Sequence, residues 1–206
     1  NLARMKFVLN KLGIEQFRKL MLQERTGLEA TLAGHFPPIV VREEDRPHHE
    51  EPIPQGPSGG FGDPAYLRWR ATNVLDQKQA EYAMVHVRLE LGDITPIQLR
   101  TLAFAAREFG DGTVRSTNQQ NFILRWVRID RITSLYRVLA SVGLAEPSAE
   151  RLADVTACPG ADTCQLGITS SRGLAAALGD LFRNGLSDLA DETGIRIKIS
   201  GCPNSC

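Results

Sequence analysis

Residues 82–98 read YAMVHVRLELGDITPIQ, and the predicted architecture is built around them. In the first half, Ala83, Val85, Val87 and Leu89 alternate with more polar residues, which is typical of a half-buried β-strand. Gly92-Asp93 then indicates a turn. The stretch 95–98 predicts a helix start, because threonine is a good N-cap, proline fits the first helical position and glutamine can complete a capping box. We therefore expect a strand, a turn and a helix that Gly110 ends.

The residues that follow carry further signals for strands and for a second helix. Residues 114–117 and 122–127 read as two strands, and Asp130 is expected to cap a helix that ends at Gly143. The expected buried positions are Leu99, Leu102, Ala103 and Ala106 in the first helix, and Ile132, Leu135, Leu139 and Val142 in the second. Strand, helix, strand, strand and helix form most of a ferredoxin-like split βαβ unit, a name that describes a fold only. His86 falls on the more polar face of its strand and is interpreted as a structural residue.

The flanking segments differ in character. Residues 1–33 predict two short amphipathic helices separated by Gly13. Residues 34–66 are rich in proline, glycine and acidic residues, which indicates a linker or extended arm, with one short strand possible at residues 39–41. His48-His49 in this segment is interpreted as an exposed loop pair, because nothing nearby completes a ligand set. The ferredoxin-like half-domain then takes residues 67–145.

The last segment, residues 146–206, contains the residues with the clearest potential for metal binding. Ser170 or Ser171 is expected to cap a helix that Gly185 ends. The expected inner face of this helix is Leu174, Leu178, Leu181 and Phe182. A shorter helix is expected to run to Glu192. A strand over residues 195–199 would then deliver Gly201-Cys202 to its carboxyl end, where such folds usually place ligands.

All four cysteines lie in two short loops of this segment. Cys158 and Cys164 have the spacing C-x5-C, and Cys202 and Cys206 have the spacing C-x3-C. Four thiolates from two loops can hold one [4Fe–4S] cluster, with one sulfur donor for each iron. A structural zinc site competes, although zinc loops favour shorter spacings. A disulfide, a redox dithiol and buried structural thiols are the other readings.

Composition narrows the class of protein. The 206 residues carry 24 basic and 24 acidic side chains, and this balance argues against a general nucleic-acid binder. No apolar run approaches the roughly 20 residues needed to span a bilayer, and no signal peptide opens the chain, so neither a membrane span nor secretion is expected. The cysteine usage indicates a reduced, cytoplasmic compartment. Because no methionine opens the chain, we expect residue 1 not to be the natural N-terminus.

The two cysteine loops and the stretch GTVRSTNQQN (residues 112–121) resemble the sirohaem-dependent nitrite and sulfite reductase family. Residues 1–17 look like the end of that family's first sirohaem-fold repeat. Residues 67–142 look like its second ferredoxin-like half-domain, and residues 146–206 look like the start of its second sirohaem-fold repeat. The resemblance implies an α+β fold in which a ferredoxin-like half-domain precedes part of a sirohaem and [4Fe–4S] binding repeat.

The resemblance also implies roles for individual residues. Cys158, Cys164, Cys202 and Cys206 would ligate the cluster, and the Cys206 sulfur would also be the axial ligand of the sirohaem iron. Asn204 would lie close to the macrocycle. The further candidates for holding sirohaem are Arg115, Arg172 and Lys198 for its carboxylates, and Gln120 and Asn121 as weaker polar contacts. Arg115 is also a weak candidate for a catalytic group.

The implied activity is a six-electron reduction of nitrite to ammonia, or of sulfite to sulfide, with electrons from ferredoxin or a flavoprotein. The sequence does not separate the two anions. The resemblance implies that the chain is an internal piece of a longer enzyme, inactive alone, whose substrate-binding basic residues lie elsewhere. Two other functions remain open: a plain [4Fe–4S] electron-transfer protein without sirohaem, and a zinc protein with four cysteine ligands.

Overall fold

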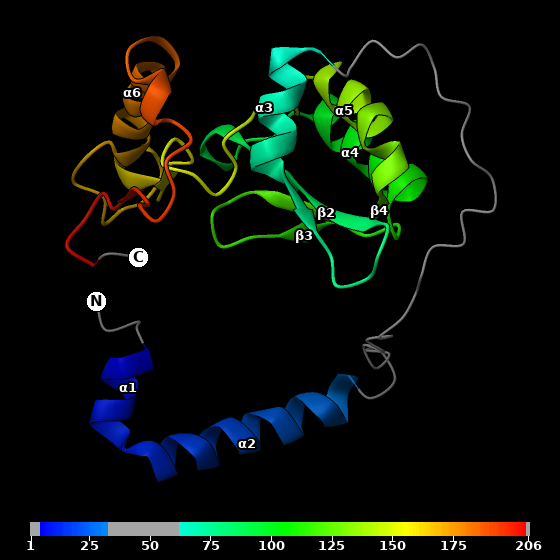
Figure 1. The fold of residues 1–206 in the computed structure, drawn as a ribbon. Helices are drawn as coiled ribbons and strands as arrows, with labels where there is room; N and C mark the ends of the chain where they lie inside the picture. The colour runs from blue at the N-terminus through cyan, green and yellow to red at the C-terminus, as the bar shows by residue number, and fades with distance from the viewer. Residues whose placement is uncertain (1–4, 33–61, 205–206) are drawn as a thin grey trace. The chain divides into compact units, whose positions relative to one another are not determined.

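The computed structural model describes residues 5–32 and 62–204, which fall into two units with boundaries at Asn1–Glu44 and Asp45–Cys206 (Figure 1). The predictions for His48-His49, for a strand at residues 39–41 and for most of the 34–66 arm lie outside the described residues, as does Cys206. No helix among the described residues is long and apolar enough to cross a membrane.

The first unit contains the two predicted helices. They are α1 (Met5–Leu12) and α2 (Ile14–Leu32), and the second is longer than expected. Gly13 joins them with a φ of +76°, a left-handed conformation that glycine adopts without strain. The described side chains of both helices are largely exposed, including Ile14, Met21 and Leu28.

The second unit begins with a four-stranded antiparallel sheet covered by helices on one face. Its strands are β1 (Val74–Asp76), β2 (Tyr82–Val87), β3 (Arg115–Ser116) and β4 (Phe122–Arg128), in the order β1-β2-β4-β3. The helices are α3 (Pro64–Asn73), α4 (Pro96–Phe109) and α5 (Ile132–Ala140), which Figure 1 shows together on one side of the sheet. Their inward side chains and those of the sheet form one buried core that includes Trp69, Val85 and Leu135.

Local sequence accounts for several boundaries of this half-domain. Thr95 accepts from the Gln98 amide while the Gln98 side chain accepts from the Thr95 amide, so the predicted capping box at α4 is present. The predicted cap at Asp130 was wrong. A 3₁₀ turn over Ile129–Arg131 precedes α5, and the Asp130 carboxylate instead binds the Arg128 guanidinium beside it.

Two elements of the half-domain were not predicted. Helix α3 begins at Pro64, inside the expected arm, with Asp63 accepting a hydrogen bond from the Ala65 amide as N-cap. Strand β1 follows it directly and is only three residues long. The buried stripe of α4 is also rotated, because Leu99 is exposed while Ala105 and Phe109 are buried. Because alanines occupy several neighbouring positions, the sequence pattern of this helix has two faces that are both apolar.

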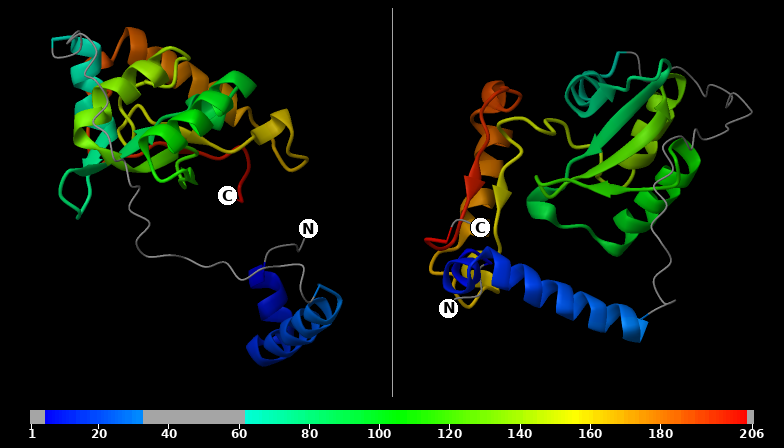
Figure 2. Two further views of the ribbon diagram at one scale, coloured as in Figure 1. Left: turned by 90° about the vertical axis from the view of Figure 1, so that its right-hand side faces the viewer. Right: turned by 90° about the horizontal axis from the view of Figure 1, so that it is seen from below.

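The second unit ends in a smaller lobe around α6 (Ser171–Asn184). Strand β5 (Thr156–Ala157) runs parallel to β6 (Lys198–Ile199), and the two views of Figure 2 show α6 alongside both strands. The predicted strand over 195–199 is paired only at its last two residues, and the predicted helix to Glu192 is a 3₁₀ turn over Ser187–Leu189.

The inner face of α6 differs from the predicted one. Ser170 is the N-cap and Gly185 the C-cap, as expected, and Phe182 is buried. Leu174 and Leu181, however, are 54% and 45% exposed. The buried residues of α6 are mostly small, namely Ser171, Ala175, Gly179 and Phe182. Small side chains allow the helix to approach the two short strands closely, which leaves Leu174 and Leu181 outside. Leu178 packs against this core, as predicted.

Candidate metal centre

The first and third cysteines follow directly from two paired parallel strands. Ala157 of β5 pairs with Ile199 of β6, and the Cys158 amide donates to the Ile199 carbonyl at 3.1 Å. Cys158 therefore lies one residue beyond the end of β5, and Cys202 three residues beyond the end of β6. Because the carboxyl ends of parallel strands meet at the same edge, the two cysteine loops begin side by side.

Hydrogen bonds tie the two loops to each other. The amides of Ile168 and Thr169, just after the first loop, donate to the Gly201 carbonyl at 2.8 and 3.2 Å. In the opposite direction, the Gly201 amide donates to the Cys158 Sγ at 3.1 Å. A backbone N–H from the second loop thus points at a sulfur of the first, as expected for a site that binds thiolate.

Three glycines allow this contact, because their backbones touch. A Cβ on Gly201 would lie 2.6 Å from the Gly160 Cα, and a Cβ on Gly167 would lie 2.4 Å from the Gly160 carbonyl carbon. A Cβ on Gly160 would lie 2.3 Å from the Ser171 Oγ, and Gly160 has a φ of +57°. No other residue type fits these three positions without moving a loop.

The electrostatic surroundings of Cys158 favour its deprotonated form. The hydrogen bond with the Ser171 hydroxyl is the largest cause that lowers the pKa of the Cys158 thiol, and the Gly201 N–H adds to it. A metal ligand must be a thiolate, so this environment suits ligation.

The other cysteines are less organised. Cys164 is exposed, although its amide donates to the Gly160 carbonyl and closes the first loop. Cys158, Cys164 and Cys202 are all free thiols, and Cys206 lies outside the described residues. Within residues 5–32 and 62–204, no group of three or more histidine, cysteine or acidic side chains is close enough to hold a metal ion. The described loops therefore bring together Cys158 and the start of the second loop.

The polar candidates of the half-domain have different surroundings. Arg115 is exposed on the short strand β3. Gln120 donates from Nε2 to the Ala157 carbonyl at 2.9 Å, so it connects the half-domain to the residue just before Cys158. Asn121 is buried; its Oδ1 accepts from the Leu89 amide and its Nδ2 donates to the Asp154 carboxylate at 2.7 Å.

The remaining candidates lie in the smaller lobe. The Arg172 guanidinium donates to the Leu91 carbonyl at 3.1 Å and to the Asp93 carboxylate, both in the half-domain. Lys198 is exposed on β6, and Asn204 is exposed in the second cysteine loop. Gln120 and Arg172 thus bind across the junction between the half-domain and the smaller lobe, whereas Arg115, Lys198 and Asn204 present their side chains to solvent.

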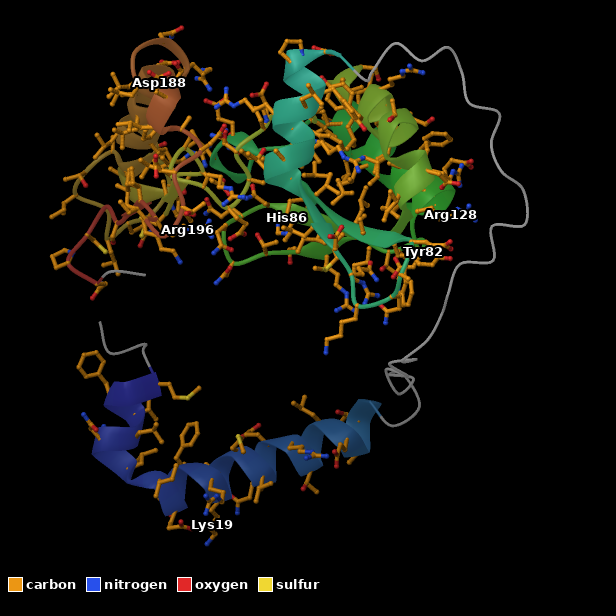
Figure 3. All side chains as sticks on the ribbon, viewed as in Figure 1. Lys19, Tyr82, His86, Arg128, Asp188 and Arg196 are labelled. Carbon is orange, nitrogen blue, oxygen red and sulfur yellow. The ribbon has the colours of Figure 1, made fainter. Side chains whose placement is uncertain are left out.

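The junction also buries groups that the sequence did not single out. The Arg88 guanidinium donates to the carbonyls of Pro147 and Ala153 and lies 3.7 Å from the buried Asp154 carboxylate. His86, expected on a polar face, is only 6% exposed, because the smaller lobe covers that side of β2. Figure 3 labels His86 and Arg196 on the two sides of this junction. The strand pattern gave no signal for this burial, since the covering residues lie more than sixty positions further on.

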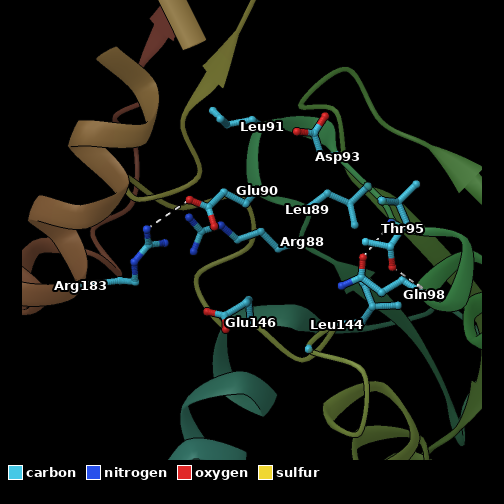
Figure 4. Close-up of a pocket in the computed structure, with 12 residues that line it drawn as sticks. Arg88, Leu89, Glu90, Leu91, Asp93, Thr95, Gln98, Leu144, Glu146 and Arg183 are labelled. Carbon is cyan, nitrogen blue, oxygen red and sulfur yellow. Dashed lines mark hydrogen bonds and ion pairs between the residues drawn. The ribbon is translucent and has the colours of Figure 1, made fainter. Parts of the chain in front are cut away.

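A cavity of about 690 Å³ opens along the same junction (Figure 4). Its walls come from the 3₁₀ turn Glu90–Gly92, the start of α4, the segment after α5 and the α6 residue Arg183. Arg183 crosses the cavity mouth to bind the Glu90 carboxylate at 3.1 Å. None of the residues predicted to bind a cofactor lines it, so the cavity is separate from the cysteine loops.

Comparison with known proteins gives a consistent result. Residues 75–142 match the family model described as the nitrite/sulfite reductase ferredoxin-like half domain. An assimilatory ferredoxin-dependent nitrite reductase of Haloferax mediterranei is 30% identical over 159 residues, which are 68% of this chain and 26% of the relative. A ferredoxin sulfite reductase of Mycobacterium tuberculosis is 30% identical over 81 residues, which are 39% of this chain and 15% of the relative.

The fold is also similar to that of a solved structure. The NirA protein of Mycobacterium tuberculosis matches with a TM-score of 0.51 and 22% identity, covering 66% of this chain and 28% of that one. The chain thus spans about a quarter of the length of the nitrite reductase it matches over most of its own sequence. The matched half-domain, the α+β fold and the relatives agree with the resemblance carried by the cysteine loops. This chain belongs to the nitrite/sulfite reductase family, and residues 75–142 are its ferredoxin-like half domain.

Proposed function

We propose that the whole protein reduces nitrite or sulfite at a sirohaem coupled to a [4Fe–4S] cluster, with ferredoxin as electron donor. The names of the relatives support the two substrates and the donor. The observation that carries the cofactor proposal is the contact between the two cysteine loops, where the Gly201 N–H points at the Cys158 Sγ at 3.1 Å.

In this proposal Cys158, Cys164, Cys202 and Cys206 would hold the cluster, and Cys206 would also be a ligand of the sirohaem. The donor set fits an iron–sulfur cluster because it is made of thiols alone, in two glycine-rich loops that already touch. The chemistry that the cluster and sirohaem would supply, when bound, is electron transfer to the anion.

The chain's own residues hold and orient these ligands. The Gly201 N–H and the Ser171 hydroxyl stabilise the Cys158 thiolate, and the touching glycines keep the loops together. Arg115 and Lys198 are the better candidates for sirohaem carboxylates, since both are exposed. Arg172 would first have to release Asp93 and the Leu91 carbonyl. Gln120 and Asn121 are assigned to holding the half-domain against the cysteine lobe.

Anaerobic reconstitution of the chain with iron and sulfide tests the ligand assignment. We expect about four irons and four sulfides per chain with broad visible absorption, and a large loss in each of the variants C158S, C164S, C202S and C206S. T163A is the matched control, because it changes the same loop and keeps all four thiols. Full occupancy in any one of the four cysteine variants would remove that residue from the ligand set.

Spectra of the full-length protein separate the alternatives. Sirohaem gives a Soret band and a red band, so a cluster without these bands would identify a plain electron-transfer protein. Zinc uptake with no visible absorption would identify a zinc protein. Steady-state rates of the full-length enzyme with nitrite and with sulfite then establish which anion it reduces.

A further inference from the structure

Ser171 lies at the point where the two cysteine loops and α6 meet. It is the first residue of α6, and its side chain is almost completely buried. Its hydroxyl donates to the Cys158 carbonyl at 2.7 Å, and the same oxygen lies 3.4 Å from the Cys158 Sγ. It also lies where a Cβ on Gly160 would be, so that glycine leaves the space that the hydroxyl fills.

The hydroxyl has one proton and two acceptors on the same cysteine. While Cys158 is a thiol, its S–H can donate to the Ser171 oxygen, and the serine O–H donates to the Cys158 carbonyl. A sulfur that binds metal has no proton and can only accept. Two donors are then close to it, the Gly201 N–H and the Ser171 O–H.

A hydrogen bond to a ligand sulfur stabilises the more negative, reduced form of a cluster and so raises its reduction potential. Ser171 is well placed for this because the first turn of α6 is fixed from both sides. The Arg172 guanidinium binds the Leu91 carbonyl and the Asp93 carboxylate, and lies 3.7 Å from the Asp162 carboxylate inside the first cysteine loop.

We propose that Ser171 is a positioning residue for the metal centre, whose hydroxyl holds Cys158 at the junction of the two loops and stabilises the reduced cluster. The inference rests on the proposed cluster, and goes beyond it by assigning a residue that is not a ligand. During reduction one electron enters the cluster from the external reductant, and the serine keeps its proton.

The test compares S171A with S170A. Ser170 is the N-cap of the same helix, and its hydroxyl accepts from the Gly173 amide at 3.2 Å, whereas the contacts with Cys158 come from Ser171. Both variants weaken the start of α6, but only S171A removes the donor near the sulfur. In reconstituted protein, a dithionite titration followed by EPR should show that S171A reduces the equilibrium constant for cluster reduction about tenfold, which is about 59 mV for a one-electron couple. S170A should keep the wild-type potential.

Hydrogen exchange in the metal-free protein gives a second readout. The Ala161 amide donates to the Thr169 carbonyl and the Cys164 amide to the Gly160 carbonyl, so both report on the first loop. We expect S171A to speed their exchange about fivefold and S170A to speed mainly that of Gly173.

The two readouts separate the inference from the proposed cluster. If wild-type protein binds no iron–sulfur cluster, the proposed function fails, and the exchange rates alone decide whether Ser171 positions Cys158. Equal loop exchange in S171A and S170A overturns the positioning role. A cluster in S171A with the wild-type potential overturns the role in stabilising the reduced form.

Discussion

The substitution G201A should separate the two cysteine loops. The added Cβ would lie 2.6 Å from the Gly160 Cα and 2.9 Å from the Thr169 carbonyl oxygen, and both neighbours are backbone atoms. Ordinary contact for a Cβ begins near 3.4 Å, so one loop must retreat by about 0.8 Å. A shift of that size lengthens the 2.8 Å bond from the Ile168 amide to the Gly201 carbonyl to about 3.6 Å, which is outside hydrogen-bond range.

We expect the variant to lose about 1–3 kcal/mol of stability from overpacking and most of its capacity to bind a cluster. The assays are the urea midpoint of the metal-free protein, and the iron and sulfide content after anaerobic reconstitution. G62A is the matched control, because nothing in the described structure lies within 4 Å of a Cβ at that position and its φ is not in the left-handed region. A G201A protein with the wild-type midpoint and a full cluster would refute the close contact of the loops.

Two further predictions concern the junction between the half-domain and the cysteine lobe. N121A removes one hydrogen bond from the buried Asp154 carboxylate, which keeps the Glu150 amide, and leaves the Leu89 amide without the Asn121 acceptor. We therefore expect a loss of about 1–3 kcal/mol in urea unfolding. N118A, at an exposed position, should change little, and equal midpoints would contradict this. Burial lowers the pKa of His86 below its ordinary 6.5, so the unfolded chain takes up the proton first and stability falls as pH decreases through 6.5. H86Q should reduce this dependence between pH 7 and pH 5, and an unchanged slope of urea midpoint against pH would count against it.

Sequence patterns predicted several elements of the half-domain and of the smaller lobe from local signals. The capping box at Thr95, the caps at Ser170 and Gly185 and the strands around residues 82–87 and 122–128 depend on neighbouring residues, and all are present. The Asp130 cap failed although its signal was local, because that carboxylate binds Arg128 instead. Two other failures needed information from distant residues. His86 looked half-exposed because its covering lobe follows much later in the chain, and α6 buries small residues because two short strands pack against it.

At the candidate site, too, some features were predictable from neighbouring residues and others depend on distant parts of the chain. The spacing of the cysteines and the glycines beside them predicts a cluster-binding segment, and their resemblance predicted the family to which the chain belongs. It did not identify Ser171, Gly167 or Arg88, because a serine at a helix start, a loop glycine and a strand arginine are all common in ordinary structural roles. Their importance depends on atoms that the fold brings within 4 Å from other segments.

The sequence by itself determines that four thiols lie in two short loops, and their spacing predicts which metals such a site would suit. Whether those thiols can act together was a matter of packing. Parallel pairing of β5 with β6 places Cys158 beside Gly201, and three glycines without side chains let the backbones touch. These contacts join segments more than forty residues apart, and their geometry arises only when the strands, α6 and the half-domain pack together.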